Sequence, residues 1–74
     1  MEKKIPYAKI KLSNNLKVLR KNNEKSINAV AAEIKLTYSY LHALEDVNVI
    51  KNPSMEILDK LSAYYGVEVY ELFL

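Results

Sequence analysis

Apolar residues recur along the chain at helical intervals, and short polar segments interrupt them. Leu12, Leu16 and Leu19 fall at i, i+4 and i+7, which puts them on one face of a helix. Ser13 is the kind of hydroxyl residue that caps a helix N-terminus. The pattern therefore predicts a first helix over residues 14–22.

Two short helices are predicted next, with a tight turn between them. After the polar segment NNEK, Ser26 stands before a run of apolar residues that share a face, which predicts a helix over 27–34. Only two residues separate that run from Thr37, a further capping hydroxyl. Thr37 precedes the segment YSYLHALE, which predicts a third helix over 38–45.

The C-terminal third predicts two more helices. Ser54 caps the segment MEILDKLSAYY, and Gly66 stands where a left-handed C-terminal cap is needed, so we expect a fourth helix over 55–65. Its expected buried stripe is Met55, Leu58, Leu61 and Tyr65. The last stretch, VEVYELFL, predicts a short fifth helix.

The N-terminal residues do not continue this pattern. Pro6 is expected to block a regular helix, while Ile5, Tyr7 and Ile10 leave open a short strand or a segment ordered only by a partner. We expect an extended arm over residues 1–12, followed by one all-α domain over 13–74.

Length and composition narrow the class of protein. A chain of 74 residues buries a single small core, and 50% hydrophobic with 27% charged residues is typical of a helix-rich globular domain. The absence of Cys excludes disulfides and thiolate metal sites. No apolar run reaches the roughly 18 residues of a membrane span, so we expect a cytoplasmic protein.

The net charge of +2 is unevenly distributed. Residues 1–25 contain eight Lys or Arg and two Glu, which gives +6, whereas residues 26–74 contain three Lys and seven acidic residues, which gives −4. A basic N-terminal part is consistent with an anionic partner, and equally with a solvated first helix.

The second and third helices have the residues that a helix-turn-helix requires. Small Ala31 allows close approach of the two helices, Leu36 fills the corner, and Leu41 and Leu44 anchor the third helix. The opposite face of that helix is then presented outward.

On these residues the sequence resembles the Cro/cI-type helix-turn-helix family of phage repressors and bacterial regulators. The resemblance covers LKVLRKNNEKSINAVAAEIKLTYSYLHALED and then NPSMEILDKLSAYYGVEVYELF. It implies a compact five-helix, lambda-repressor-like fold that binds double-stranded DNA as a homodimer on a pseudo-palindromic operator. A bacterial or phage-encoded, nucleoid-associated repressor without a cofactor, metal or small-molecule substrate would fit it.

The chain departs from the family pattern at three places. Ile27 stands where the family often has a phosphate-binding Gln, which leaves Ser26 and Asn28 as candidates. Lys35 replaces the usual turn Gly, so it must either adopt a left-handed conformation or shift the turn. The loop DVNVIKN is longer than the family's and lacks Gly.

The resemblance also assigns roles to individual residues. The expected base-reading residues are Thr37, Tyr38, Ser39, His42 and Ala43. The expected phosphate contacts are Lys9, Lys11, Lys17, Ser26, Asn28, Lys35, Tyr40 and Lys51. Arg20 and Glu45 are expected to form a structural ion pair, and the expected dimer contacts are Tyr65, Val69, Tyr70, Phe73 and Leu74.

An alternative function uses the same scaffold to bind a protein. The third helix has no Lys or Arg, and Tyr38, Tyr40, His42, Asp46 and Val47 would form a surface that docks on another regulator. An enzyme is not expected, because the sequence has no nucleophile–base pair, glycine-rich phosphate loop or metal cluster.

Overall fold

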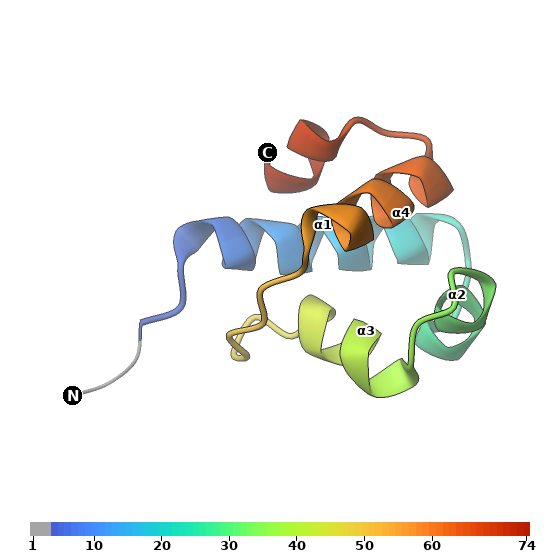
Figure 1. The fold of residues 1–74 in the computed structure, drawn as a ribbon, viewed down its shortest axis with the longest axis horizontal. Coiled ribbons are helices and arrows are strands. Elements are labelled where there is room, and N and C mark those ends of the chain that lie inside the picture. The colour runs from blue at the N-terminus through green and yellow to red at the C-terminus, as the bar shows by residue number, and fades with distance from the viewer. Residues whose placement is uncertain (1–3) are drawn as a thin grey trace.

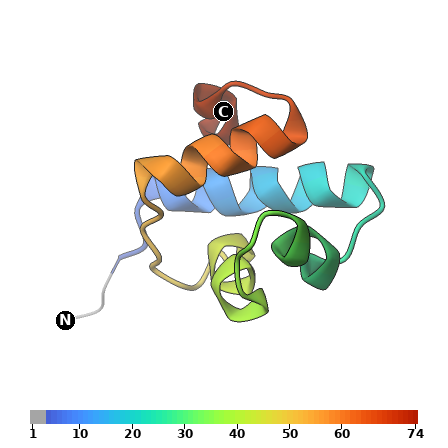
Figure 2. The same ribbon diagram turned by 45° about the vertical axis from the view of Figure 1, so that its right-hand side comes forward.

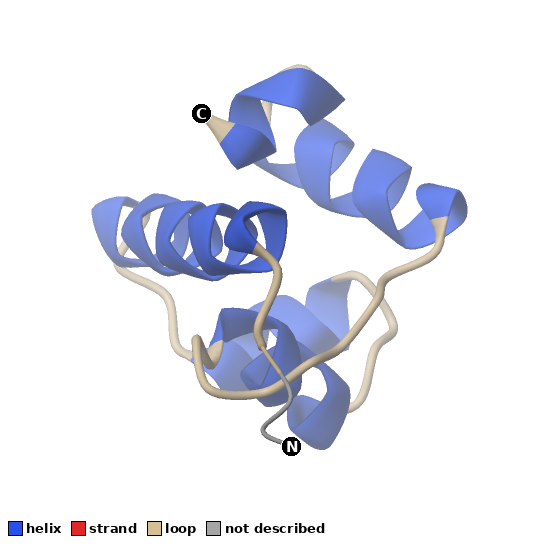
Figure 3. Cartoon of the chain, turned by 90° about the vertical axis from the view of Figure 1, so that its left-hand side faces the viewer, coloured by secondary structure: helices blue, strands red, loops and turns tan. Residues whose placement is uncertain are grey.

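Four α-helices and one 3₁₀ helix form the fold. A computed structural model describes residues 4–74, with elements α1 (Tyr7–Asn22), α2 (Ile27–Glu33), α3 (Tyr38–Glu45), α4 (Met55–Tyr65) and the 3₁₀ helix η1 (Val69–Phe73). The α2–α3 pair lies on one side of α1, and α4 with η1 lies on another (Figures 1 and 2). The view turned by 90° shows α2 and α3 below α1, with α4 and η1 above and to the right of it (Figure 3).

Three helices begin at the predicted residue because a side chain caps each of them. The hydroxyls of Ser26, Thr37 and Ser54 accept hydrogen bonds from the N–H three residues ahead, at 3.1, 3.1 and 3.2 Å. Gly66 ends α4 with φ +68°, the left-handed cap expected there.

The start of α1 was predicted wrongly. α1 begins at Tyr7, so residues 7–12 are helical and not an extended arm, and Ser13 lies inside the helix without capping it. Pro6 precedes the first turn with φ −59°, where the missing N–H has no cost, and its carbonyl accepts from the N–H groups of Lys9 and Ile10 at 3.0 and 3.2 Å. Pro6 therefore starts the helix. Residues 1–3 of the expected arm lie outside the described residues.

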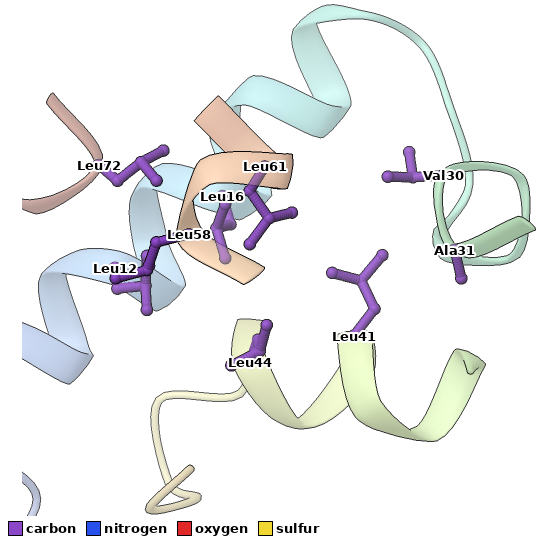
Figure 4. Close-up of a cluster of buried hydrophobic side chains, with 9 residues drawn as sticks. All are labelled: Leu12, Leu16, Val30, Ala31, Leu41, Leu44, Leu58, Leu61 and Leu72. Carbon is purple, nitrogen blue, oxygen red and sulfur yellow. The ribbon is translucent and has the colours of Figure 1, made fainter. Parts of the chain in front are cut away.

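The core collects side chains from all five elements (Figure 4). Its buried members are Leu12, Leu16, Val30, Ala31, Leu41, Leu44, Leu58, Leu61 and Leu72. Met55, expected in the buried stripe of α4, is 73% exposed, whereas Ile57 in the same turn packs against the core. The corner of the helix-turn-helix is closed by a 2.8 Å hydrogen bond from the Leu36 N–H to the Ala31 carbonyl.

The fifth helix is a 3₁₀ turn and not an α-helix. η1 begins with a capping box. The Glu68 side chain accepts from the backbone N–H of Glu71, and the Glu71 side chain accepts from the backbone N–H of Glu68. The Asn15 amide of α1 donates to the Leu72 and Leu74 carbonyls at 2.8 and 3.0 Å. These contacts hold the C-terminus against α1 with buried Leu72 in the core.

Candidate nucleic-acid interface

α3 has one buried and one exposed face. Leu41, Leu44 and Glu45 are buried, whereas Thr37, Tyr38, Ser39 and His42 are exposed and Ala43 is half-buried. Because residues three and four apart are neighbours on a helix, the side chains at 38, 39, 42 and 43 form one continuous surface. The structure thus brings together four of the five residues predicted to face bases, and the fifth, Thr37, caps the start of the same helix.

Two aromatic rings dominate this surface. The Tyr38 ring stacks on the His42 imidazole with centroids 5.7 Å apart and an angle of 27° between the rings. Tyr38 is 48% exposed. The face offers the Tyr38 ring, the His42 imidazole and the hydroxyls of Thr37, Tyr38 and Ser39, and no cation.

The tight turn before α3 requires a left-handed backbone conformation at Lys35. Lys35 has φ +59°, so of the two alternatives for this position the chain adopts the left-handed conformation and does not shift the turn. Its side chain is exposed at the entrance to α3.

The loop after α3 places Lys51 against a side chain of that helix. The Lys51 ammonium lies 4.8 Å from the centroid of the Tyr40 ring, a cation–π contact between the loop and α3. Two residues predicted to contact phosphate, from separate elements, are therefore adjacent.

Lys17 lies at a cleft between α1, the start of α2 and the end of α3. The cleft has a volume of about 320 Å³ and is lined by Lys17, Arg20, Ile27, His42, Glu45, Asp46, Val47 and Asn48. The Asp46 carboxylate accepts from the Asn48 N–H at 2.9 Å. Besides the charges of Arg20 and Glu45, the cleft therefore places one cation, Lys17, and one anion, Asp46, beside the exposed face of α3.

Arg20 and Glu45 form an ion pair between α1 and α3. The Arg20 Nε lies 3.0 and 2.9 Å from the two carboxylate oxygens of Glu45, and Nη1 donates to the Lys25 carbonyl at 2.9 Å. The hydrogen bond to Glu45 raises the pKa of the Arg20 guanidinium. The pair is nearly inaccessible to solvent, which is consistent with a structural role.

A helix-turn-helix family model matches residues 16–72, which is most of the chain. The chain belongs to the Cro/cI-type helix-turn-helix family. This is a family of DNA-binding transcription regulators. Comparison with curated proteins and with solved structures gave no match.

Two further observations concern residues 4–74 of this helix-turn-helix protein. No helix in that range is both long and apolar enough to cross a membrane. The same range holds no group of three His, Cys, Asp or Glu side chains placed to bind a metal ion.

Two lysines predicted to contact phosphate lie away from the exposed face of α3. Lys9 is only 4% exposed, and its ammonium donates to the Ser13 hydroxyl and to the Ala43 and Asp46 carbonyls at 2.7, 3.2 and 2.8 Å. Burial lowers the pKa of Lys9, and nearby Asp46 opposes that effect. The prediction of a phosphate contact is wrong for Lys9, because its ammonium is already occupied by protein oxygens.

Lys11 is turned away by the helical period. It lies two residues, or about 200°, from Lys9 around α1, and so on the side opposite α3. Its ammonium lies 5.4 Å from the centroid of the Tyr7 ring. In a helix that begins at Tyr7, Lys9 lies four residues before Ser13 and so shares its buried face. Knowledge of that helix start would have indicated that Lys9, and not Lys11, faces α3.

The five residues predicted to form a dimer contact divide into two groups. Val69 and Phe73 are half-buried against the core, and Tyr65 is half-buried. Tyr70 and Leu74 are 66% and 69% exposed. Most of the free apolar surface of this set therefore belongs to Tyr70 and Leu74.

Proposed function

We propose that this helix-turn-helix protein is a sequence-specific transcriptional regulator, a Cro-like repressor that binds a pseudo-palindromic operator as a homodimer. The observation that carries the proposal is the exposed face of α3, whose hydroxyl, imidazole and aromatic side chains face solvent while the opposite face is fixed in the core. A helix of this kind, preceded by a tight turn, fits the major groove of B-DNA.

The composition of that face determines what it reads. Thr37, Ser39 and His42 donate and accept single hydrogen bonds, whereas bidentate contacts to guanine or adenine need Arg, Asn or Gln. The Tyr38 ring and the Ala43 methyl pack against thymine methyl groups. We expect a preference for A·T pairs, with part of the specificity coming from DNA shape.

Attraction to the phosphates comes from residues around α3. Lys17 at the cleft, Lys35 at the turn and Lys51 on the Tyr40 ring are the cations near the exposed face. Ser26 and Asn28, both exposed at the start of α2, supply polar contacts. Lys9 and Lys11 are not part of this proposed set.

Selection of bound sequences from random duplex DNA, followed by affinity measurements at two salt concentrations, tests the function. Each of Lys17→Ala, Lys35→Ala and Lys51→Ala should reduce the magnitude of the slope of log affinity against log salt by about two, since each removes one phosphate contact from each subunit of the dimer. Lys60→Ala, an exposed lysine on α4, is the matched control and should leave the slope unchanged. Affinity that is weak for every duplex and insensitive to salt would refute the proposal.

The same surface also supports binding of a protein partner, because Asp46 adds a negative charge to the cleft beside His42. DNA phosphates are repelled by a carboxylate, whereas a basic protein surface is not. The double variant Tyr38→Ala, Ser39→Ala distinguishes the two functions. Unchanged DNA binding together with a lost protein pull-down would favour the protein-binding function.

A further inference from the structure

Two side chains of α1 hold the C-terminal end of α3. The Lys9 ammonium donates to the carbonyls of Ala43 and Asp46, and the Ser13 hydroxyl donates to the carbonyl of Leu44 at 2.6 Å. Lys9 also donates to the Ser13 hydroxyl, so the two side chains form one connected network. Both are almost completely buried. We call this network the Lys9–Ser13 clamp.

The clamp adds hydrogen-bond donors at the C-terminal end of α3, where the Ala43 carbonyl also accepts from the Asp46 N–H and the Asp46 carbonyl from the Val49 N–H at 3.1 Å. The last four carbonyls of any helix lack intrahelical partners, and α3 has only eight residues. It ends without glycine, at Asp46 in an extended conformation, with a single long 3.4 Å backbone bond to the Ala43 carbonyl. A buried ammonium also suits the negative end of the helix dipole.

The clamp belongs to a row of contacts that runs along one face of α1. Lys9, Ser13 and Arg20 share that face, and they contact residues 43–46 of α3 through the clamp and through the ion pair to Glu45. Directional bonds at one end of a short helix fix its tilt and rotation more tightly than apolar packing alone. Because Tyr38 and His42 belong to α3, the orientation of α3 also determines the orientation of its exposed face.

We propose that Lys9, together with Ser13, is a positioning residue for base readout, which sets the orientation at which α3 meets DNA without itself touching nucleic acid. The inference rests on the proposed function. A cation that positions the reading helix leaves a different signature from one that neutralises phosphate. Its loss should reduce discrimination between sequences and leave the salt dependence unchanged.

Lys9→Met tests the clamp, because the unbranched Met side chain is only one atom shorter than that of Lys and has no donor. We expect affinity for the selected duplex to fall about tenfold, with affinity for random duplex and the salt slope nearly unchanged. Lys9→Arg, which retains a buried cation with donors, should recover part of the loss. Lys11→Met, the same substitution on the opposite face of α1, should change neither quantity.

A direct measurement on the free protein separates the clamp from DNA binding. In Lys9→Met and in Ser13→Ala, the carbonyl ¹³C resonances of Ala43, Leu44 and Asp46 should shift and amide exchange across residues 44–46 should quicken. Ser13→Ala also serves if Lys9→Met does not fold. If wild-type protein binds no duplex, the proposed function fails, while these resonances still decide whether the clamp holds α3.

Three results would overturn the inference. One is a salt slope whose magnitude falls by about two in Lys9→Met, which would mark a direct phosphate contact in each subunit of the dimer. Another is a specificity ratio that stays at the wild-type value in both Lys9→Met and Ser13→Ala. The third is carbonyl resonances and amide exchange across 43–46 that do not change in either variant.

Discussion

The hydroxyl of Tyr65 is buried and has no hydrogen-bond partner among residues 4–74. Its ring meets the Tyr64 ring edge-on, with centroids 5.0 Å apart and an angle of 82°. Because an unpaired buried hydroxyl costs free energy, Tyr65→Phe should raise the free energy of unfolding by about 1 kcal/mol. Urea denaturation measures this. Tyr64→Phe is the control, since it removes a bond to the Glu33 carboxylate and should give no gain.

The same residue makes the free energy of unfolding depend on pH in the alkaline range. Burial, with a further contribution from Glu45, raises the pKa of Tyr65 from 10.0 to about 12. The fold therefore favours the neutral phenol, and this contribution is complete below pH 10.0 and lost as pH rises towards about 12. Unfolding free energies measured across that interval should decline less steeply for Tyr65→Phe. An identical decline for both proteins would contradict the assignment to Tyr65.

Residue identity alone did not predict the role of Lys9. A lysine in a basic segment normally remains solvated, and the prediction of a phosphate contact followed from that expectation. Its partners are carbonyls of Ala43 and Asp46, more than thirty residues away in the sequence. By contrast, the resemblance implies an ion pair between Arg20 and Glu45, and the structure contains that pair.

Elements were predictable where the signal is local. Ser26, Thr37 and Ser54 cap the helices that follow them through bonds spanning three residues, so sequence alone located those starts. Pro6 is compatible with either a break or a helix start, and packing of Leu12 and Ser13 decides between them. The 3₁₀ geometry of η1 likewise depends on distant contacts from Asn15.

The turn into α3 carries strain that a glycine would relieve. Lys35 has φ +59°, a conformation that costs an L-residue with a Cβ free energy and costs Gly very little, so Lys35→Gly should raise the free energy of unfolding by about 1 kcal/mol. Thermal denaturation measures the gain. Lys35→Ala keeps the Cβ and should give no comparable gain, so equal stabilisation by both variants would contradict the explanation.

Glu24 provides a second test at the other tight turn. It has φ +54° between α1 and α2, so Glu24→Gly should stabilise the fold by a similar amount. Under the proposed function only Lys35→Gly also lowers the salt slope of DNA binding, because it removes a cation beside α3. The pair of variants thus separates backbone strain from charge.

For the whole molecule, α1 links α3 to the C-terminal segment. One face of α1 binds the end of α3 through Lys9 and Arg20, and Asn15 binds the carbonyls of η1. The exposed residues of η1 and the exposed face of α3 are therefore both held by α1. A second copy that docks on η1 would fix the separation of two α3 helices, which an operator with two half-sites requires.

The proposed dimer makes a specific prediction about Tyr70 and Leu74. Both are largely exposed, so Tyr70→Ser and Leu74→Ser should leave the fold intact while each weakens dimerisation at least about tenfold, since each removes an apolar side chain from the contact. Sedimentation equilibrium across a range of protein concentrations measures this. Met55→Ser is the matched control, because Met55 is equally exposed at the start of α4 and outside the proposed contact. Equal effects of all three substitutions, or none, would show that η1 does not form the dimer contact.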